Sequence, residues 1–207
     1  NPRLGIIGGL SILGTTGIIE PMSEDALKDT IALELKCHKA LGKDAVILVP
    51  GNYGEEFSSK RLGASKTNIV KISNYLGFAL EKCQEYGYKN IILSGHIGKL
   101  VKPAGGIFYT HSRVSDTRME ILTAHLALMG MKREQLREIM NCSTTEEAIT
   151  IIDKTGYSDI YGLMAEKCAQ RCEDYVFGEI QIGVVLFSMK SLLAKSSKTD
   201  ELLEELR

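Results

Sequence analysis

The pattern of hydrophobic and polar residues along the chain alternates between two spacings. Short continuous apolar runs are typical of strands that are buried on both faces of a sheet. They predict strands over residues 4–8, 45–49, 91–93 and 181–187, with a partner strand over 192–194. Apolar residues three or four positions apart predict amphipathic helices. This spacing predicts a helix over residues 69–83, helices that begin near residues 23, 113, 143 and 158, and a tail helix from residue 199. Ser143 and Glu146 have the spacing of a capping box that opens the helix near residue 143.

The order of these elements predicts the fold class. Up to residue 93, the chain runs strand, helix, strand, helix, strand. Each crossover is long enough for a right-handed βαβ unit, so we expect a Rossmann-like α/β fold with a largely parallel sheet and helices on both faces. The second half is mostly helical before a late strand or hairpin. We expect a single α/β domain over residues 1–195 and a tail helix over residues 196–207.

Composition narrows the classes of partner. The 207 residues are 44% hydrophobic and 25% charged, which is ordinary for a soluble globular protein. With 25 basic and 26 acidic residues the net charge is −1, so the chain lacks the basic balance that a nucleic-acid partner requires. No apolar run approaches the roughly 20 residues of a membrane span. We therefore expect neither nucleic acid nor a membrane among its partners.

Cysteine usage indicates the compartment. The five cysteines are scattered, form no C-x-x-C motif and follow no secretion signal, so we expect reduced thiols in a cytoplasm. Cys168 and Cys172 lie four residues apart on a predicted helix and could share a metal, but the same spacing suits small apolar core residues. We favour the core and expect no metal. The chain begins without an initiator Met and almost inside a strand, which indicates a piece of a longer protein.

Three polar segments each follow a predicted strand. They are the glycine-rich segment 8–17, the segment 51–57 (GNYGEEF), which we expect to be a loop, and the segment 94–99 (SGHIGK). In a parallel sheet the carboxyl ends of the strands lie at one edge, and ligands bind there. We therefore expect the three segments to form one cleft.

The first two segments carry the candidate cofactor residues. In the first, glycine amides can approach a ligand closely, but the spacing does not match G-x-G-x-x-G, so a simple tight turn is the alternative to a ligand site. In the second, Asn52, Tyr53 and Glu55 lie where nucleotide-binding sheets accept ribose hydroxyl protons. Glu55 could be that acceptor and Tyr53 could stack on a flat ring, unless they are ordinary loop residues. The candidates in the first segment are Gly14, Thr15, Thr16 and Gly17.

The third segment begins a stretch that carries cations and histidines. His96, Lys99 and Lys102 are three residues apart, so in a helical turn they share about a third of its circumference. Two lysines that close repel each other, so an anionic ligand between them is an attractive alternative to a solvated basic patch. A loop histidine among cations can stay neutral and accept a proton near pH 7. His96 and His111, which both lie in predicted loops, are therefore the candidate general bases.

Four segments resemble the CbiD family. They read GTTGIIEPMSEDAL, LVPGNYGEEF, SGHIGKLVKPAGGIFYTHSRVSDTRMEILTAH and EIQIGVVLF, and the resemblance runs in the same order over residues 3–187. CbiD proteins are cobalt-precorrin-5B C1-methyltransferases of anaerobic cobalamin biosynthesis. The resemblance implies transfer of a methyl group from S-adenosylmethionine to ring carbon C-1 of a cobalt-containing tetrapyrrole. Family members carry a further domain before this region, so it also implies an N-terminal domain as partner.

The chemistry of that reaction assigns roles to the candidates. The sulfonium methyl is already electrophilic, so no metal is needed to activate it. Acetate and propionate arms of the tetrapyrrole suit Lys99, Lys102 and Arg113, because carboxylates pair with lysine as a point charge and with arginine bidentately. His96 or His111 would handle protons, and the cofactor would lie over the first two polar segments.

Two other classes of function stay open. A nicotinamide-dependent oxidoreductase would use the same sheet and glycine segment to hold NAD(P), although the G-x-G-x-x-G fingerprint is missing. A non-catalytic tetrapyrrole-binding or scaffolding module would need a partner protein. Whether the chain forms a homo-oligomer is open as well.

Overall fold

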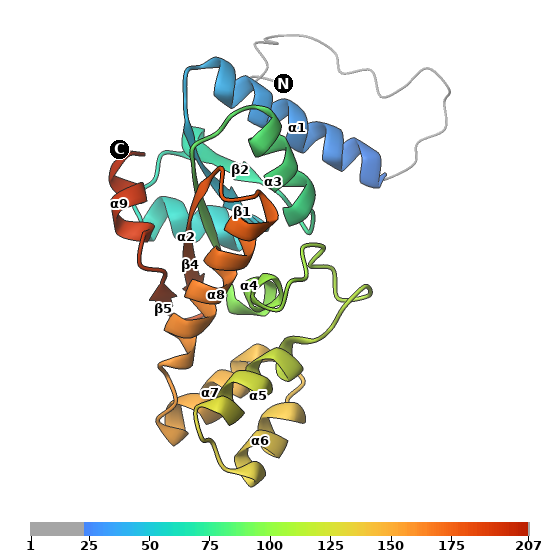
Figure 1. Cartoon of the computed structure of the whole chain (residues 1–207), viewed down its shortest axis with the longest axis vertical. Coiled ribbons are helices and arrows are strands. Elements are labelled where there is room, and N and C mark those ends of the chain that lie inside the picture. Colours follow the sequence, from blue (N-terminus) through green and yellow to red (C-terminus); the bar gives the residue numbers. More distant parts are fainter. Residues whose placement is uncertain (1–22, 207) are drawn as a thin grey trace.

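A five-stranded sheet forms the centre of the protein (Figure 1). The structure, a computed structural model, describes residues 23–206. The strand order is β2-β1-β3-β4-β5, in which β1 to β4 are parallel and β5 runs antiparallel to β4. The predicted α/β fold, with a largely parallel sheet and a late hairpin, is confirmed, whereas the predicted strand over 4–8 lies outside the described residues. The strands are β1 (Ala45–Val49), β2 (Ile69–Lys71), β3 (Asn90–His96), β4 (Gln181–Phe187) and β5 (Leu192–Lys195).

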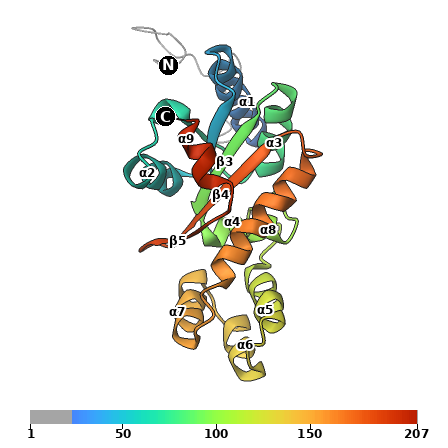
Figure 2. The ribbon, with the colours of Figure 1, turned by 60° about the vertical axis from the view of Figure 1, so that its left-hand side comes forward.

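Helices connect these strands and cover both faces of the sheet (Figure 2). Ser23 caps the first of them, and its Oγ accepts the N–H of Ala26 at 3.0 Å, in agreement with the predicted start. The helices are α1 (Glu24–Ala40), α2 (Asn52–Arg61), α3 (Leu76–Glu85), α4 (Ile97–Ala104), α5 (Arg118–Leu128), α6 (Arg133–Met140), α7 (Thr145–Thr155), α8 (Ile160–Tyr175) and α9 (Thr199–Glu204), with a 3-10 helix, η2 (Lys66–Asn68), before β2.

Alternating side chains of the strands pack into two separate apolar cores. On β1, Val46 and Leu48 join the core beneath α1, α3, α4 and α8, whereas Ile47 and Val49 join the core beneath α2 and α9. All five side chains of β1 are buried, because helices cover the sheet on both sides. This burial on two sides explains why the strands appear in the sequence as continuous apolar runs.

The second half of the chain forms a helical lobe beyond the carboxyl edge of the sheet (Figure 1). α4 leaves β3, α5 to α7 make up the lobe, and α8 packs on α4 as it returns to β4. Cys168 and Cys172 lie with Met164 on the buried side of α8, which confirms their prediction as core residues. Within residues 23–206, no helix combines the length and the apolar character that a membrane span requires.

Residues 52–57 belong to a helix, whereas a loop was predicted over 51–57. Gly51 precedes α2, and the polar residues that follow it form the first turns of that helix. α2 is rich in charged and hydroxyl side chains, so it lacks the regular apolar stripe by which a helix is found in a sequence. Its position is decided by packing, because Gly54 and Ser58 are the buried residues on its inner side.

The helix predicted over residues 69–83 is wrong in its first third. Residues 69–71 form strand β2, and α3 begins only at residue 76. Ile69 packs into one core while Val70 and Ile72 pack into the other, which is the period of a strand. Apolar residues at 69, 72 and 76 fit a helical spacing equally well, so the sequence pattern alone did not separate the two elements.

Boundaries in the second half also differ from the prediction. α6 was not predicted, and α5 begins at Arg118 and not near residue 113. The capping box that opens α7 is formed by Thr144 and Glu147, one residue later than the predicted pair of Ser143 and Glu146. This shift matters for the functional site, because it leaves the carboxylate of Glu146 available for other contacts.

A pair of glycines tests how tightly α2 is held against the sheet. An added Cβ at Gly54 would come within 2.8 Å of Val49 Cβ and 2.9 Å of the Ser94 carbonyl oxygen, whereas one at Gly51 would meet no atom within 4 Å. We expect Gly54→Ala to lower the free energy of unfolding by about 1–3 kcal/mol through overpacking. Gly51→Ala, whose backbone is extended, should change it little. Chemical denaturation of both variants measures the difference, and equal effects would contradict the close packing.

Acid should destabilise the fold through His38. Its Nδ1–H donates to the Tyr88 hydroxyl at 2.9 Å, its Nε2 has no partner within the described residues, and burial, with nearby Lys43 and Lys39, lowers its pKa from 6.5 to about 4. The unfolded chain therefore binds this proton first, so stability is lost as the pH falls from 6.5 towards 4. We expect His38→Gln, which cannot titrate, to reduce this pH dependence. Urea unfolding at several pH values measures both slopes, and parallel slopes would contradict the assignment.

Candidate functional site

At the carboxyl ends of β1 and β3, the helices that follow the two strands turn to opposite faces of the sheet. The two strands are adjacent and parallel, with Leu48 opposite Leu93. α2 follows β1 and covers one face, whereas α4 follows β3 directly and covers the other. Such a divergence is where open parallel sheets bind ligands. Asn52 and His96 therefore start their helices at the same edge of the sheet.

His96 is held by hydrogen bonds at both ring nitrogens. As the N-cap of α4, its Nδ1 accepts the N–H of Gly98 at 3.1 Å. Its Nε2 lies 2.9 Å from Oε1 of Glu146. Because Nδ1 accepts a backbone amide, the neutral ring carries its proton on Nε2 and donates it to the carboxylate. The ring also meets Phe187 edge-on, at 6.1 Å between centroids.

Glu146 joins three parts of the molecule. Its Oε1 also accepts the backbone N–H of Met189 at 3.1 Å, so one carboxylate on α7 binds the end of β3 and the turn after β4. The sequence interpretation had placed Glu146 in the capping box of α7. Its partners lie 50 and 43 residues away in the chain, and no local pattern indicates such contacts.

A hollow beside α4 gathers two of the three predicted substrate-binding residues and one predicted general base. We call it the cationic hollow; it has a volume of about 230 Å³ and lies where the loop before α5 meets α4. The predicted residues Lys99, Lys102 and His111 line it together. The predicted Arg113 is exposed and is not part of the lining, where Arg118 is found instead. The full lining is Asn74, Gly98, Lys99, Lys102, Thr110, His111, Ser112 and Arg118.

Lys102 is the most constrained of these cations. It is 2% exposed, and its Nζ donates to the Thr110 carbonyl oxygen at 2.9 Å. Burial lowers the pKa of Lys102, the negative charge of Asp116 raises it, and the positive charge of Arg118 lowers it further. Arg118 itself binds Asp116 through two hydrogen bonds of 2.6 and 3.0 Å. No ion pair is formed by Lys102 with the rest of residues 23–206. A buried cation without a paired carboxylate favours an anion in the space beside it.

Lys99 and His111 complete the polar lining. Lys99 is half-buried and donates to the Asn74 side-chain oxygen, and burial together with Lys102 lowers its pKa. Nδ1 of His111 accepts the Arg113 N–H at 3.1 Å, so its neutral ring carries the proton on Nε2, like His96. Both histidines thus present a donor nitrogen, which suits carboxylate binding better than removal of a proton.

The predicted cofactor residues that the structure describes do not line one common hollow. Glu55 forms an ion pair with Lys71 of β2 at 3.2 Å, while Tyr53, two residues earlier on α2, lines a different hollow. Asn52 is exposed at the start of α2. The remaining candidates, Gly14, Thr15, Thr16 and Gly17, lie outside the described residues.

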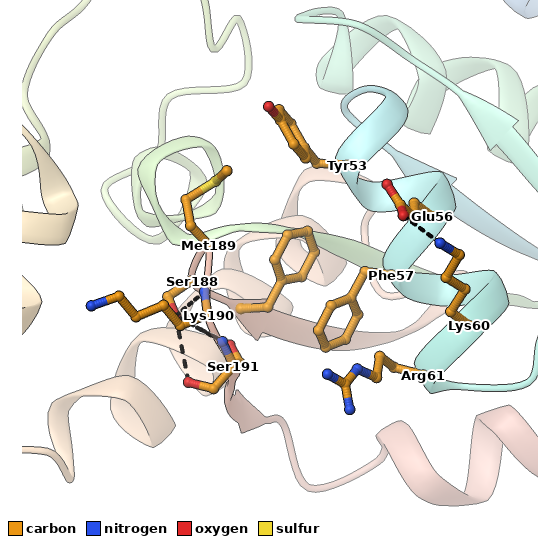
Figure 3. Close-up of a pocket in the computed structure, with 10 residues that line it drawn as sticks. Tyr53, Glu56, Phe57, Lys60, Arg61, Ser188, Met189, Lys190 and Ser191 are labelled. Carbon is orange, nitrogen blue, oxygen red and sulfur yellow. Dashed lines mark hydrogen bonds and ion pairs between the residues drawn. The ribbon is translucent and has the colours of Figure 1, made fainter.

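A second hollow lies between α2 and the β4–β5 turn (Figure 3). We call it the aromatic hollow, because Phe57 and Phe187 stack beside it with 4.3 Å between ring centroids. Its volume is about 400 Å³. The lining is Tyr53, Glu56, Phe57, Lys60, Arg61, Phe187, Ser188, Met189, Lys190 and Ser191.

The two hollows are separate, so the prediction of a single cleft is wrong for the described residues. Their linings share no residue. His96 lies between them, since its ring contacts Phe187 of the aromatic hollow and its Nδ1 binds Gly98 of the cationic hollow. Within residues 23–206, no group of three or more His, Cys, Asp or Glu side chains is placed to hold a metal ion.

Comparison with protein families identifies two matching regions. The family model described as "CbiD, C-terminal domain" matches residues 109–197, and the model described as "CbiD" matches residues 1–21. The first match includes the helical lobe, α8 and the β4–β5 hairpin, and therefore Glu146 and one side of each hollow.

Curated relatives match almost the whole chain. A cobalt-precorrin-5B C(1)-methyltransferase of Clostridioides difficile (strain 630) is 48% identical over 99% of this chain and 51% of its own length. Proteins of the same name from Alkaliphilus metalliredigens (strain QYMF) and Thermoanaerobacter sp. (strain X514) are 45% and 46% identical, over 100% and 97% of the chain and 55% and 56% of their own lengths. The chain thus spans about half the length of these relatives. No solved structure matches it significantly.

The bridging role of Glu146 can be tested with a matched acid. Glu146→Ala removes the acceptor of the His96 and Met189 N–H groups, and we expect the free energy of unfolding to fall by about 1–3 kcal/mol. Glu120→Ala is the control, because Glu120 is also an acid in the first turn of a helix but is exposed. Chemical denaturation compares them. Similar losses would mean that Glu146 acts only on the helix dipole.

Proposed function

The chain belongs to the CbiD family, and from this premise we propose that it forms part of an S-adenosylmethionine-dependent cobalt-precorrin-5B C1-methyltransferase of cobalamin biosynthesis. The activity is proposed for the whole protein, because the chain spans about half the length of its relatives. The remaining half is then its obligatory partner, and the five free cysteines, three of which are buried, suit action in the cytoplasm.

The observation that supports this function most is the buried Lys102 in the cationic hollow. A lysine that is 2% exposed and lacks a carboxylate partner within the described residues is stabilised when an anion enters. Lys99 and Arg118 line the same space. A volume of about 230 Å³ is too small for a tetrapyrrole ring but suits one or two of its acetate or propionate arms. The hollow would therefore fix the orientation of the substrate.

The cofactor would lie at the carboxyl edge of the sheet, beside the start of α2. S-adenosylmethionine supplies an electrophilic methyl group, so the protein has to align the acceptor carbon with it, and alignment of this kind contributes roughly 7–11 kcal/mol. Asn52 offers an exposed amide at the start of α2 for ribose hydroxyls or the carboxylate of the cofactor. We assign the amides of Gly14 and Gly17, with the hydroxyls of Thr15 and Thr16, to the same ligand. Glu55 is paired with Lys71, so we assign it a structural role.

The two histidines take different parts in this proposal. His96 is a positioning residue, because both of its ring nitrogens are occupied by Gly98 and Glu146. His111 lines the cationic hollow and contacts the substrate, where its Nε2–H donates to a carboxylate arm. His111 thus adds a neutral donor beside the cations Lys99, Lys102 and Arg118.

Two other functions are tested against this one. A nicotinamide-dependent oxidoreductase would bind NADP, and a non-catalytic tetrapyrrole-binding module would bind the substrate without turnover. Calorimetry of the full-length protein with S-adenosylhomocysteine and with NADP distinguishes the methyltransferase from the oxidoreductase, because binding of NADP alone would overturn the methyltransferase proposal. An assay of methyl transfer from labelled S-adenosylmethionine distinguishes the methyltransferase from the binding module.

Neutralising the cationic hollow should weaken substrate binding selectively. We expect Lys99→Gln with Lys102→Met in the full-length protein to raise KM for cobalt-precorrin-5B by about 10–100-fold, through the loss of two charged contacts. KM for S-adenosylmethionine should stay unchanged. Glutamine keeps a donor for Asn74, and methionine fills the volume of Lys102 without a buried charge.

The control replaces two exposed lysines in the same way, with Lys36→Gln and Lys154→Met. It should leave both KM values unchanged. Thermal unfolding checks the fold, and Lys102→Met should be neutral or stabilising, since it removes a buried charge. Equal rises in both KM values would contradict the assignment of the cationic hollow to the tetrapyrrole.

A further inference from the structure

The aromatic hollow exposes large apolar side chains on both of its sides. Tyr53 on α2 is 65% exposed and Met189 on the β4–β5 turn is 55% exposed. Figure 3 shows Tyr53 and Phe57 on one side of the hollow and Met189 and Lys190 on the other. Apolar residues that face each other across a hollow, instead of being scattered, indicate a surface that a ligand covers.

The base of this hollow suits a flat ring. The stacked rings of Phe57 and Phe187 are nearly parallel, with 8° between their planes. Phe187 is 3% exposed and is fixed as the last residue of β4, so this base does not depend on a mobile loop. Aromatic faces and a methionine thioether contact flat conjugated systems favourably.

The rim of the hollow selects the charge of the ligand. Lys60 is paired with Glu56 at 2.6 Å, but Arg61 and Lys190 form no ion pair within residues 23–206. Two cations without acid partners, set on opposite sides of an apolar base, favour a ligand with an apolar body and anionic groups on its periphery. They disfavour the sulfonium cation of the methyl donor, because like charges repel.

We propose that the aromatic hollow binds the ring system of an anionic tetrapyrrole, an inference that rests on the proposed function and locates its substrate. The ring lies against Phe57 between Tyr53 and Met189, and its carboxylate arms reach Arg61 and Lys190. Tyr53, considered from the sequence as a cofactor residue, becomes a substrate-binding residue.

One tetrapyrrole bound in the aromatic hollow would also reach the cationic hollow. His96 contacts Phe187 on one side and binds the amide of Gly98 on the other. A tetrapyrrole is larger than either hollow, so with its ring over the aromatic hollow its arms extend past His96 towards Lys99 and Lys102 of the cationic hollow. The hydrogen bond from the Met189 N–H to Glu146 holds the turn that carries one side of the ring site.

The test uses the full-length protein with Arg61→Glu and Lys190→Glu combined. Uroporphyrin is the probe, because it is a flat, fluorescent tetrapyrrole whose rim carries acetate and propionate groups. We expect its Kd, measured by fluorescence anisotropy, to rise by about tenfold or more, since attraction at two positions becomes repulsion. Binding of S-adenosylhomocysteine, measured by calorimetry, should stay unchanged. A cationic porphyrin of similar ring size should bind the variant no more weakly than the wild type.

Two further variants separate charge from shape. Arg133→Glu with Arg137→Glu makes the same change of charge on exposed positions of α6 and should leave uroporphyrin binding unchanged. Tyr53→Ala with Met189→Ala keeps every charge and removes two exposed side chains, so the fold is retained. We expect it to weaken uroporphyrin binding several-fold and to raise KM for cobalt-precorrin-5B with little change in KM for S-adenosylmethionine.

The outcomes distinguish this inference from the function on which it rests. Unchanged uroporphyrin binding in the Arg61 and Lys190 variant, or no binding to the wild type, overturns the ring site even if methyl transfer proceeds. Loss of S-adenosylhomocysteine binding alone assigns the hollow to the cofactor and also overturns it. Uroporphyrin binding that depends on both cations in a protein without methyl transfer supports the ring site and contradicts the proposed activity.

Discussion

The direct passage from β3 into α4 is the constraint on which the polar edge of this protein depends. His96 is both the last residue of the strand and the N-cap of the helix, so no loop separates a buried sheet from the first turn of α4. Its side chain satisfies the Gly98 amide and binds Glu146, which in turn holds the turn after β4. One side chain therefore links the helical lobe to the sheet and lies between the two hollows.

Burial of charge is the second feature that shapes the site. The pKa of Lys102 is lowered mainly by its burial, and Asp116, the acid that opposes this shift, is already bound by Arg118. Such an arrangement contributes little to stability, because a buried cation without a paired acid is costly. In the proposed function it serves ligand binding, because the anion that would complete it comes from the substrate. Arg61 and Lys190, which form no ion pair within residues 23–206 and line the hollow beside the stacked aromatic rings, follow the same logic at the surface.

Local patterns were sufficient for some elements and insufficient for others. The apolar runs of β1 and β4 were predicted with correct boundaries, because residues buried on both faces leave a continuous signal. α2 and β2 were missed, since the one is polar and held by close packing at Gly54, and the other is only three residues long. In the candidate site, the spacing of Lys99 and Lys102 placed them together, whereas Arg118 and Glu146 enter through contacts between distant elements.

The sequence by itself determined the fold class, the family and the grouping of a histidine and lysines at the end of β3. These depend on residues that are close in the chain, where the period of burial and the helical spacing are readable. Only the tertiary structure decided that Glu55 turns to Lys71, that Arg113 stays outside, and that one expected cleft is two hollows with a histidine between them. The reason is physical: a carboxylate or a ring selects its partner by direction and distance in space, and neither quantity is contained in the separation of residues along the chain.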